Sequence, residues 1–161
     1  MDMQHFTQKS RDALGEAQTL ALRFGHQEMD IEHLALALAT QENGLVPRLL
    51  ERLHINPKDY ATAISDDLAK RPSVSGPGAT AQIAVSRRLG QILIKARDFA
   101  RQLKDEYVSV EHIFCAILDD DRGTPLGKID ERFKLTREAV LGVLADVRGS
   151  QRVTSDNPED T

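Results

Sequence analysis

The sequence predicts an all-α protein made of two tandem four-helix repeats, about eight helices, packed with pseudo-twofold symmetry. The first observation is an internal repeat at an offset of 79 residues, the separation of Leu14 and Leu93. The second is a scarcity of aromatic residues, 4% of the chain with no tryptophan, so that Leu, Ile, Val and Ala must form the core. Such a core suits helices better than sheets. The third is the length of 161 residues, about that of one ordinary domain.

The repeat consists of four segments that occur in the same order in both halves. The last pair is offset by 80 residues, which indicates one inserted residue in the second copy. The matching segments are 14–21 with 93–100, 30–34 with 109–113, 37–38 with 116–117, and 53–56 with 133–136.

The first two helices of each repeat follow from apolar spacing and capping residues. Apolar residues at spacings of three and four predict a helix over about 6–24 and its counterpart over about 86–103. The second helix, over about 31–41, starts after Asp30, a good N-cap, with a glutamate in its first turn. Ser109 and Glu111 repeat that arrangement in the second copy.

The last two helices of each repeat begin at proline or at a capping residue. A short third helix is expected over about 46–53, with Pro47 near its first turn, and Pro125 has the same place in the second copy. The fourth helix starts at Asn56-Pro57, and Thr136 caps its twin. No alternation of apolar and polar residues predicts a strand.

The chain divides into one domain and a tail. We expect the domain over 1–148, with repeat one over about 1–70, a linker over about 71–82 and repeat two over about 83–148. The linker is expected to be flexible and exposed because it contains two prolines and two glycines. Residues 149–161 are polar, and we expect a flexible tail or the start of a linker to a part that this chain lacks.

Composition excludes several classes of function. The net charge of −4 argues against a nucleic-acid binder. Cys115 is the only cysteine, which excludes an internal disulfide and a multi-cysteine zinc site, and its apolar neighbours indicate core packing in a reducing compartment. No signal peptide and no membrane span are found, so a cytoplasmic protein without membrane contact is expected.

Motifs for catalysis are weak, and we expect this chain not to be an enzyme. The glycines of Gly76-Pro77-Gly78 lack the lysine of a phosphate-binding loop. The Glu-His pairs at 32–33 and 111–112 lack zinc-binding spacing and are interpreted as helix starts with a partly buried histidine. The acids 119–121 are interpreted as a solvated helix end, and the basic pairs 70–71 and 87–88 as solvated faces. We therefore expect neither a metal nor a cofactor in this chain.

The fold itself favours a binding module. Two similar helical units packed face to face leave a groove where they meet, and grooves between helices commonly bind peptides through apolar anchors.

Several segments together resemble one family, the N-terminal (Clp repeat) domains of Clp-type AAA+ chaperones, in particular the bacterial ClpB type. They are Phe6-Thr7-x-Lys9, Ile31-Glu32-His33-Leu34, Glu111-His112-Ile113-Phe114 and the ending 151–160. The resemblance covers essentially the whole chain. The ending resembles the ClpB lead-in to the first ATPase domain, which favours ClpB over the ClpA and ClpC types.

The resemblance implies a function. The full-length protein would be a homohexameric, ATP- and Mg-dependent disaggregase of the heat-shock (Hsp100) class that works with the DnaK system and threads polypeptides through a pore. This chain, expected to be a monomer on its own, would engage unfolded or aggregated polypeptide through an apolar groove. The resemblance also implies that Thr7, Asp105 and Glu111 matter for chaperone activity, and that Leu93 and His112 line the groove.

Each implied residue also has a structural interpretation. Thr7 is suited to cap the first helix, Asp105 to end the fifth, Glu111 to stabilise a helix start, and Leu93 to fill the core. Three other functions stay open: an adaptor-docking module of a ClpA- or ClpC-type unfoldase, a free-standing protein, and, remotely, a small-molecule enzyme.

Overall fold

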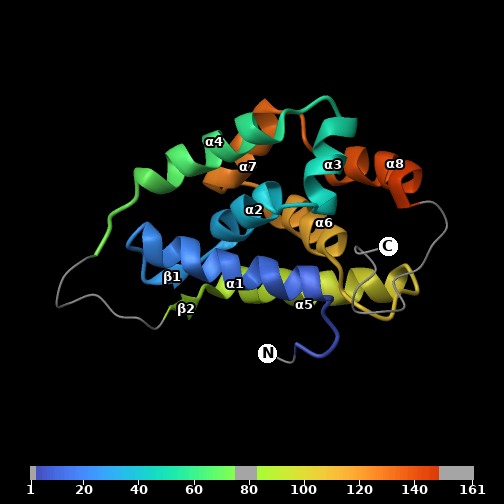
Figure 1. Ribbon diagram of the computed structural model, residues 1–161, viewed down its shortest axis with the longest axis horizontal. Coiled ribbons are helices and arrows are strands. Elements are labelled where there is room, and N and C mark those ends of the chain that lie inside the picture. The colour runs from blue at the N-terminus through green and yellow to red at the C-terminus, as the bar shows by residue number, and fades with distance from the viewer. Residues whose placement is uncertain (1–2, 75–82, 149–161) are drawn as a thin grey trace.

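A computed structural model describes residues 3–74 and 83–148 (Figure 1). Most of the expected linker and the whole expected tail, 75–82 and 149–161, lie outside the described residues. The described part contains eight helices and two short strands, in agreement with the predicted fold class. In chain order they are α1 (Gln8–Arg23), β1 (Glu28–Met29), α2 (Ile31–Thr40), α3 (Leu45–Arg52), α4 (Pro57–Ala69), β2 (Ala84–Val85), α5 (Arg87–Gln102), α6 (Val110–Asp120), α7 (Pro125–Arg132) and α8 (Arg137–Arg148).

Helices α2 and α6 form the centre of the molecule. They lie between α1 and α5 on one side and the four shorter helices α3, α4, α7 and α8 on the other (Figure 1). Residues 31–39 of α2 and 110–117 of α6 are all buried. A helix that is largely apolar all round its surface needs cover on every side, which explains the central place of these two.

The two repeats are related as a pseudo-twofold axis requires. Strand β1 pairs in parallel with β2, with Met29 opposite Val85. A separate bridge places Phe6 opposite Val108. The repeat offset of 79 carries Phe6 to Val85 and Met29 to Val108, so each repeat makes the same contact with the other. In the same way α3 packs on α8, and α4 on α7.

The capping residues predicted from the sequence are confirmed. Thr7 accepts the backbone N–H of Ser10 at the start of α1, and Asp30 and Ser109 are the N-caps of α2 and α6. The histidine three residues after each of these last two caps completes the cap: Nδ1 of His33 and of His112 accepts the backbone N–H of its N-cap residue at 2.9 Å.

The structure corrects several smaller expectations. Both short strands were missed, because two residues are too few to show alternation. Both histidines of the Glu-His pairs are completely rather than partly buried. Asp121 is also buried, whereas Asp119 and Asp120 lie at the surface near Lys95, as a solvated helix end should.

Arg71 is not part of a solvated face. Its guanidinium lies 3.0 Å from the buried carboxylate of Glu32, so the first residue of the expected linker is bound to repeat one. The neighbouring residues 72–74 are exposed, as expected for a linker. No helix in the described residues is long and apolar enough to span a bilayer.

Candidate functional site

Four of the five residues that the family resemblance singled out lie in one region, here called the acid cluster region. Asp105 lies in the turn between α5 and α6, and Glu111 and His112 lie in the first turn of α6. Thr7 reaches the same turn because its backbone N–H donates to Val108 O at 3.0 Å. The fifth residue, Leu93, lies on the buried face of α5 and forms part of the hydrophobic core.

Arg148 holds the acid cluster together. Its guanidinium donates to Asp105 Oδ1, and its Nη1 lies 3.6 Å from Glu111 Oε2. Asp105 Oδ2 lies 2.7 Å from Nε2 of His112, and the hydroxyl of Ser109 donates to Glu111. Two buried carboxylates are thus balanced by one arginine and by hydrogen bonds, which is the arrangement that makes buried charge tolerable.

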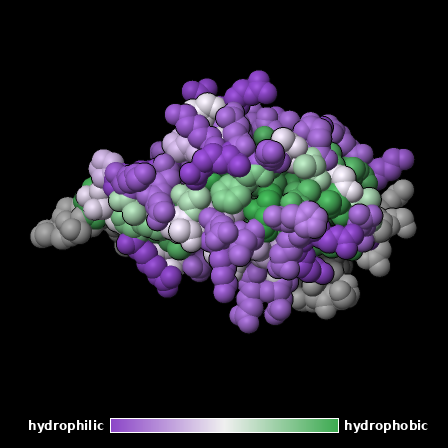
Figure 2. All heavy atoms as spheres, turned by 90° about the horizontal axis from the view of Figure 1, so that it is seen from above, coloured by the Kyte–Doolittle hydropathy of each residue, from purple (hydrophilic) through white to green (hydrophobic). Residues whose placement is uncertain are grey.

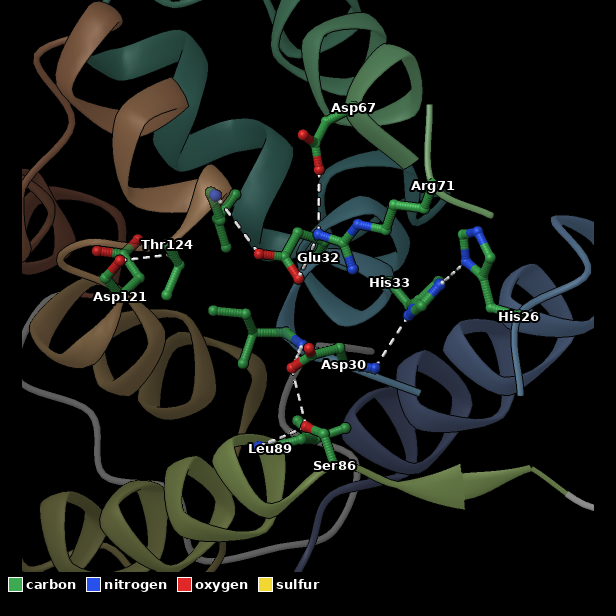
Figure 3. A network of polar contacts seen from close by, with 12 residues as sticks. His26, Asp30, Glu32, His33, Asp67, Arg71, Ser86, Leu89, Asp121 and Thr124 are labelled. Carbon is green, nitrogen blue, oxygen red and sulfur yellow. Dashed lines mark hydrogen bonds and ion pairs between the residues drawn. The ribbon is translucent and has the colours of Figure 1, made fainter. Parts of the chain in front are cut away.

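Repeat one carries a related network, shown in Figure 3. Glu32, the counterpart of Glu111, binds Arg71, and Arg71 also binds Asp67 at 3.0 Å. The counterpart of the Asp105–His112 contact is a contact between His26 Nδ1 and His33 Nε2 at 2.8 Å. Each repeat therefore uses an arginine at or just beyond the end of its fourth helix to neutralise the buried glutamate of its second helix.

Burial dominates the electrostatics of the network in repeat one. Burial, together with the nearby His26 ring and the charge of Arg71, lowers the pKa of His33 to about 4. Burial likewise raises the pKa of Glu32, although Arg71 opposes this shift. Because both pKa values are lowered, His26 and His33 are neutral near pH 7. These hydrogen bonds and ion pairs join the first turn of α2 to the end of α4 and to the loop after α1.

A third polar contact joins the two repeats. The hydroxyl of Tyr60 on α4 donates to Asp130 Oδ1 on α7 at 2.6 Å, and both side chains are buried. Burial, together with a hydrogen bond with Asp121, raises the pKa of Asp130 to about 9. Asp130 is therefore a neutral acid at pH 7 that can donate to the carboxylate of Asp121.

The predicted site residues are interior residues. Leu93 is 5% exposed and His112 is not exposed at all, so neither offers an anchor at the surface in this structure. Thr7, Asp105 and Glu111 are also buried. Their functional role stays a prediction, and the sequence analysis missed Arg148, which binds two of them.

Open apolar surface exists elsewhere. Figure 2 looks onto the side where α3, α4, α7 and α8 lie and shows a band of hydrophobic residues among hydrophilic ones. A hollow of about 970 Å³ lies between the end of α2, helix α3 and the start of α4. Its apolar wall includes Ala39, Pro47, Ile55 and Ala61.

The fold and its two buried acid–arginine networks define a duplicated four-helix repeat domain. Residues 5–129 match the family model described as the Clp repeat (R) N-terminal domain, and the chain belongs to that family.

The chain is similar in sequence to ClpB chaperones. It is 64% identical over its full length to the chaperone protein ClpB of Nitratidesulfovibrio vulgaris and 35% identical, again over its full length, to that of Clostridium perfringens. It spans about a fifth of these relatives, 19% in both cases. The chain is accordingly an N-terminal domain of the ClpB (Hsp100) chaperone type, and the resemblance inferred from its sequence is confirmed.

Solved structures show the same fold. The Hsp104 N-terminal domain from Candida albicans superposes with a TM-score of 0.83 at 25% identity, over 98% of this chain and 100% of that one. A complex of the ClpV N-domain with VipB peptide matches with a TM-score of 0.69 at 18% identity, over 91% of this chain and 89% of that one.

Proposed function

We propose that this domain engages unfolded or aggregated polypeptide for an ATP-dependent disaggregase and helps to deliver it to the pore of the hexamer. The observation that carries the proposal is the 64% identity to a ClpB chaperone over the entire chain. The open apolar band of Figure 2 supports it, because an unfolded chain exposes apolar side chains that a folded protein hides. A ClpV N-domain with the same fold was solved with a peptide bound.

The proposal extends to the full-length protein. There, ATP and Mg would be bound by ATPase modules outside this chain, the assembly would be a homohexamer, and the DnaK system would be its partner in the cytoplasm. The isolated domain would be a monomer. The division into repeats at about 1–70 and 83–148, a linker at 71–82 and a tail at 149–161 belongs to the same proposal.

The five predicted site residues enter the proposal as positioning residues. Thr7, Asp105, Glu111 and His112 hold the start of α1, the turn before α6 and the end of α8 in one arrangement. Leu93 packs α5 on the hydrophobic core. We infer that they shape the surface that meets the client, because a buried side chain reaches a client only if the domain opens.

The alternative function is docking of one folded adaptor, as in ClpA- or ClpC-type unfoldases. The two functions differ in what is bound. A client surface binds many unfolded chains weakly, while an adaptor surface binds one folded partner tightly and selectively.

Backbone-amide NMR titration tests the proposal. The ¹⁵N-labelled chain is titrated with reduced, carboxymethylated lactalbumin, which is permanently unfolded, and separately with the native protein. We expect saturable shifts with the unfolded form alone. The absence of shifts at millimolar concentration contradicts the proposal, and selective nanomolar binding of one folded protein favours the adaptor function.

A further inference from the structure

The hollow between α2, α3 and α4 lies within repeat one. Three small or short side chains form its wall: Ala39 at the end of α2, Pro47 on α3 and Ala61 on α4. Ala39 is 3% and Ala61 8% exposed, so both lie at the floor of the hollow. The space above them is about 970 Å³ and open to solvent.

The second repeat shows which side chains suit this place. At the positions equivalent to 39 and 61 it carries Leu118 and Leu141, whereas the position of Pro47, the third residue of α3, is taken by Gly127, the third residue of α7. Leu118 and Leu141 pack against the hydrophobic core. The same backbone arrangement therefore accepts branched aliphatic side chains in repeat two and lacks them in repeat one.

A second, polar hollow continues from the first. The two share Thr40 and Gln41, and the second runs between α1 and the loop after α2. Three carboxylates line it, Asp12, Glu16 and Glu42, against the single ammonium of Lys9, which already donates to Glu42 O at 3.2 Å. An occupant that extends from the apolar hollow into the polar one meets an excess of negative charge.

We propose that the paired hollows bind an unfolded polypeptide segment in which leucine-like side chains are followed by lysine or arginine. The aliphatic side chains take the place that Leu118 and Leu141 fill in repeat two, and the basic residues face the carboxylates at 12, 16 and 42. The inference rests on the proposed function and names the segment chemistry that this surface selects. It places the contact in repeat one, on α2–α4 and the neighbouring part of α1.

Peptide binding tests this inference directly. The probe is a labelled Gly-Leu-Leu-Lys-Lys-Gly peptide, and its partner has both lysines replaced by glutamate. We expect the lysine peptide to shift the amides of Ala39, Ala61 and Thr62, and to bind about tenfold or more tightly than the glutamate peptide.

Three variants, one of them a matched control, test the two hollows. Ala61→Leu supplies the residue that repeat two carries there, and we expect it to weaken the lysine peptide by about tenfold or more. Ala145→Leu makes the same change at an exposed position on α8, and we expect no change in affinity. Glu42→Lys lies at the exposed rim and tests charge without touching the core; we expect weaker binding of the lysine peptide alone.

The outcomes separate this inference from the function on which it rests. Equal binding of both peptides, or unchanged affinity in a folded Ala61→Leu variant, overturns the inference. If the unfolded lactalbumin still binds in that case, the proposed function stands and its contact lies elsewhere. If the peptide binds as expected but unfolded lactalbumin does not, the hollow is confirmed as a basic-apolar peptide site and the proposed function fails.

Discussion

Nε2 of His112 lies 2.7 Å from Oδ2 of Asp105, and Nδ1 of the same ring accepts the backbone N–H of Ser109. Because Nδ1 is an acceptor, the ring proton is on Nε2 and is donated to the carboxylate. One side chain thus completes the cap of α6 and holds the acid that receives Arg148. The end of α8 is thereby bound to the turn before α6 and to the first turn of α6.

Removing Arg148 should destabilise the domain strongly. Arg148→Met leaves two buried carboxylates without their cation, and we expect a loss of about 1–3 kcal/mol in the free energy of unfolding, less than for a fully buried pair because the arginine is partly exposed. Urea unfolding followed by circular dichroism measures it. Arg148→Met combined with Asp105→Asn should lose less than the sum of the single variants.

The control is an arginine in an exposed ion pair. Arg52 lies 3.3 Å from Asp146, and both side chains are more than half exposed. Arg52→Met should cost less than about 1 kcal/mol. Equal losses for the two arginine variants would show that the acid cluster does not need its cation.

The buried acid between the repeats should make stability depend on pH. Burial raises the pKa of folded Asp130 to about 9, against an ordinary value of about 4 in the unfolded chain. Its contribution to stability is therefore complete below about pH 4 and is lost as the pH rises towards 9. Asp130→Asn keeps an acceptor for Tyr60 and a donor for Asp121, so it should gain stability over the parent chain as the pH rises, by at least about 1–2 kcal/mol near pH 8.

Asp119 offers a control of opposite sign. A hydrogen bond from Lys95 lowers its pKa, so its contribution is present above about pH 4 and is lost in acid. Asp119→Asn should therefore be slightly less stable than the parent at pH 7 and equal to it at low pH. Thermal unfolding between about pH 2 and 9 measures both variants, and a pH-independent difference for Asp130→Asn would contradict the neutral buried acid.

The lone thiol should be inert in the folded protein. Cys115 is completely buried on α6, and burial raises its pKa to about 12, with the Glu111 carboxylate adding to the shift. Ellman's reagent needs an accessible thiolate, so we expect no reaction in buffer and one equivalent in 6 M urea. Rapid reaction in buffer would show that α6 opens readily.

Local sequence signals predicted the fold well because helix starts depend on neighbouring residues. Asp30 and Ser109 cap the helices that they were expected to cap, and the helix expected over about 86–103 covers Arg87–Gln102. The internal repeat predicted how the two halves are arranged, since two copies of one unit with matching apolar faces pack through equivalent contacts.

Long-range polar contacts could not be predicted in this way. Arg148 and Asp105 are 43 residues apart, and Tyr60 and Asp130 are 70 apart. No spacing rule links such residues, because only the packed helices bring them together. All five candidate site residues came from the family resemblance and four of them lie together, but the resemblance did not indicate that they are buried.

The equivalent caps Thr7 and Ser86 allow a matched test of the role implied for Thr7. Each hydroxyl accepts a backbone N–H at a helix start, at 3.2 Å from Ser10 and 3.0 Å from Leu89. Thr7→Ala and Ser86→Ala should each lower the free energy of unfolding by about 0.5–2 kcal/mol, because both lose a cap.

Binding of unfolded lactalbumin then separates capping from a direct role. Thr7 is not exposed, so we expect Thr7→Ala and Ser86→Ala to bind the unfolded protein equally well at a temperature where both are folded. Thr7→Ser should restore the parent stability, since it keeps the hydroxyl. A loss of binding in Thr7→Ala alone, at the same stability as Ser86→Ala, would mean that Thr7 contacts the client and that the start of α1 opens to admit it.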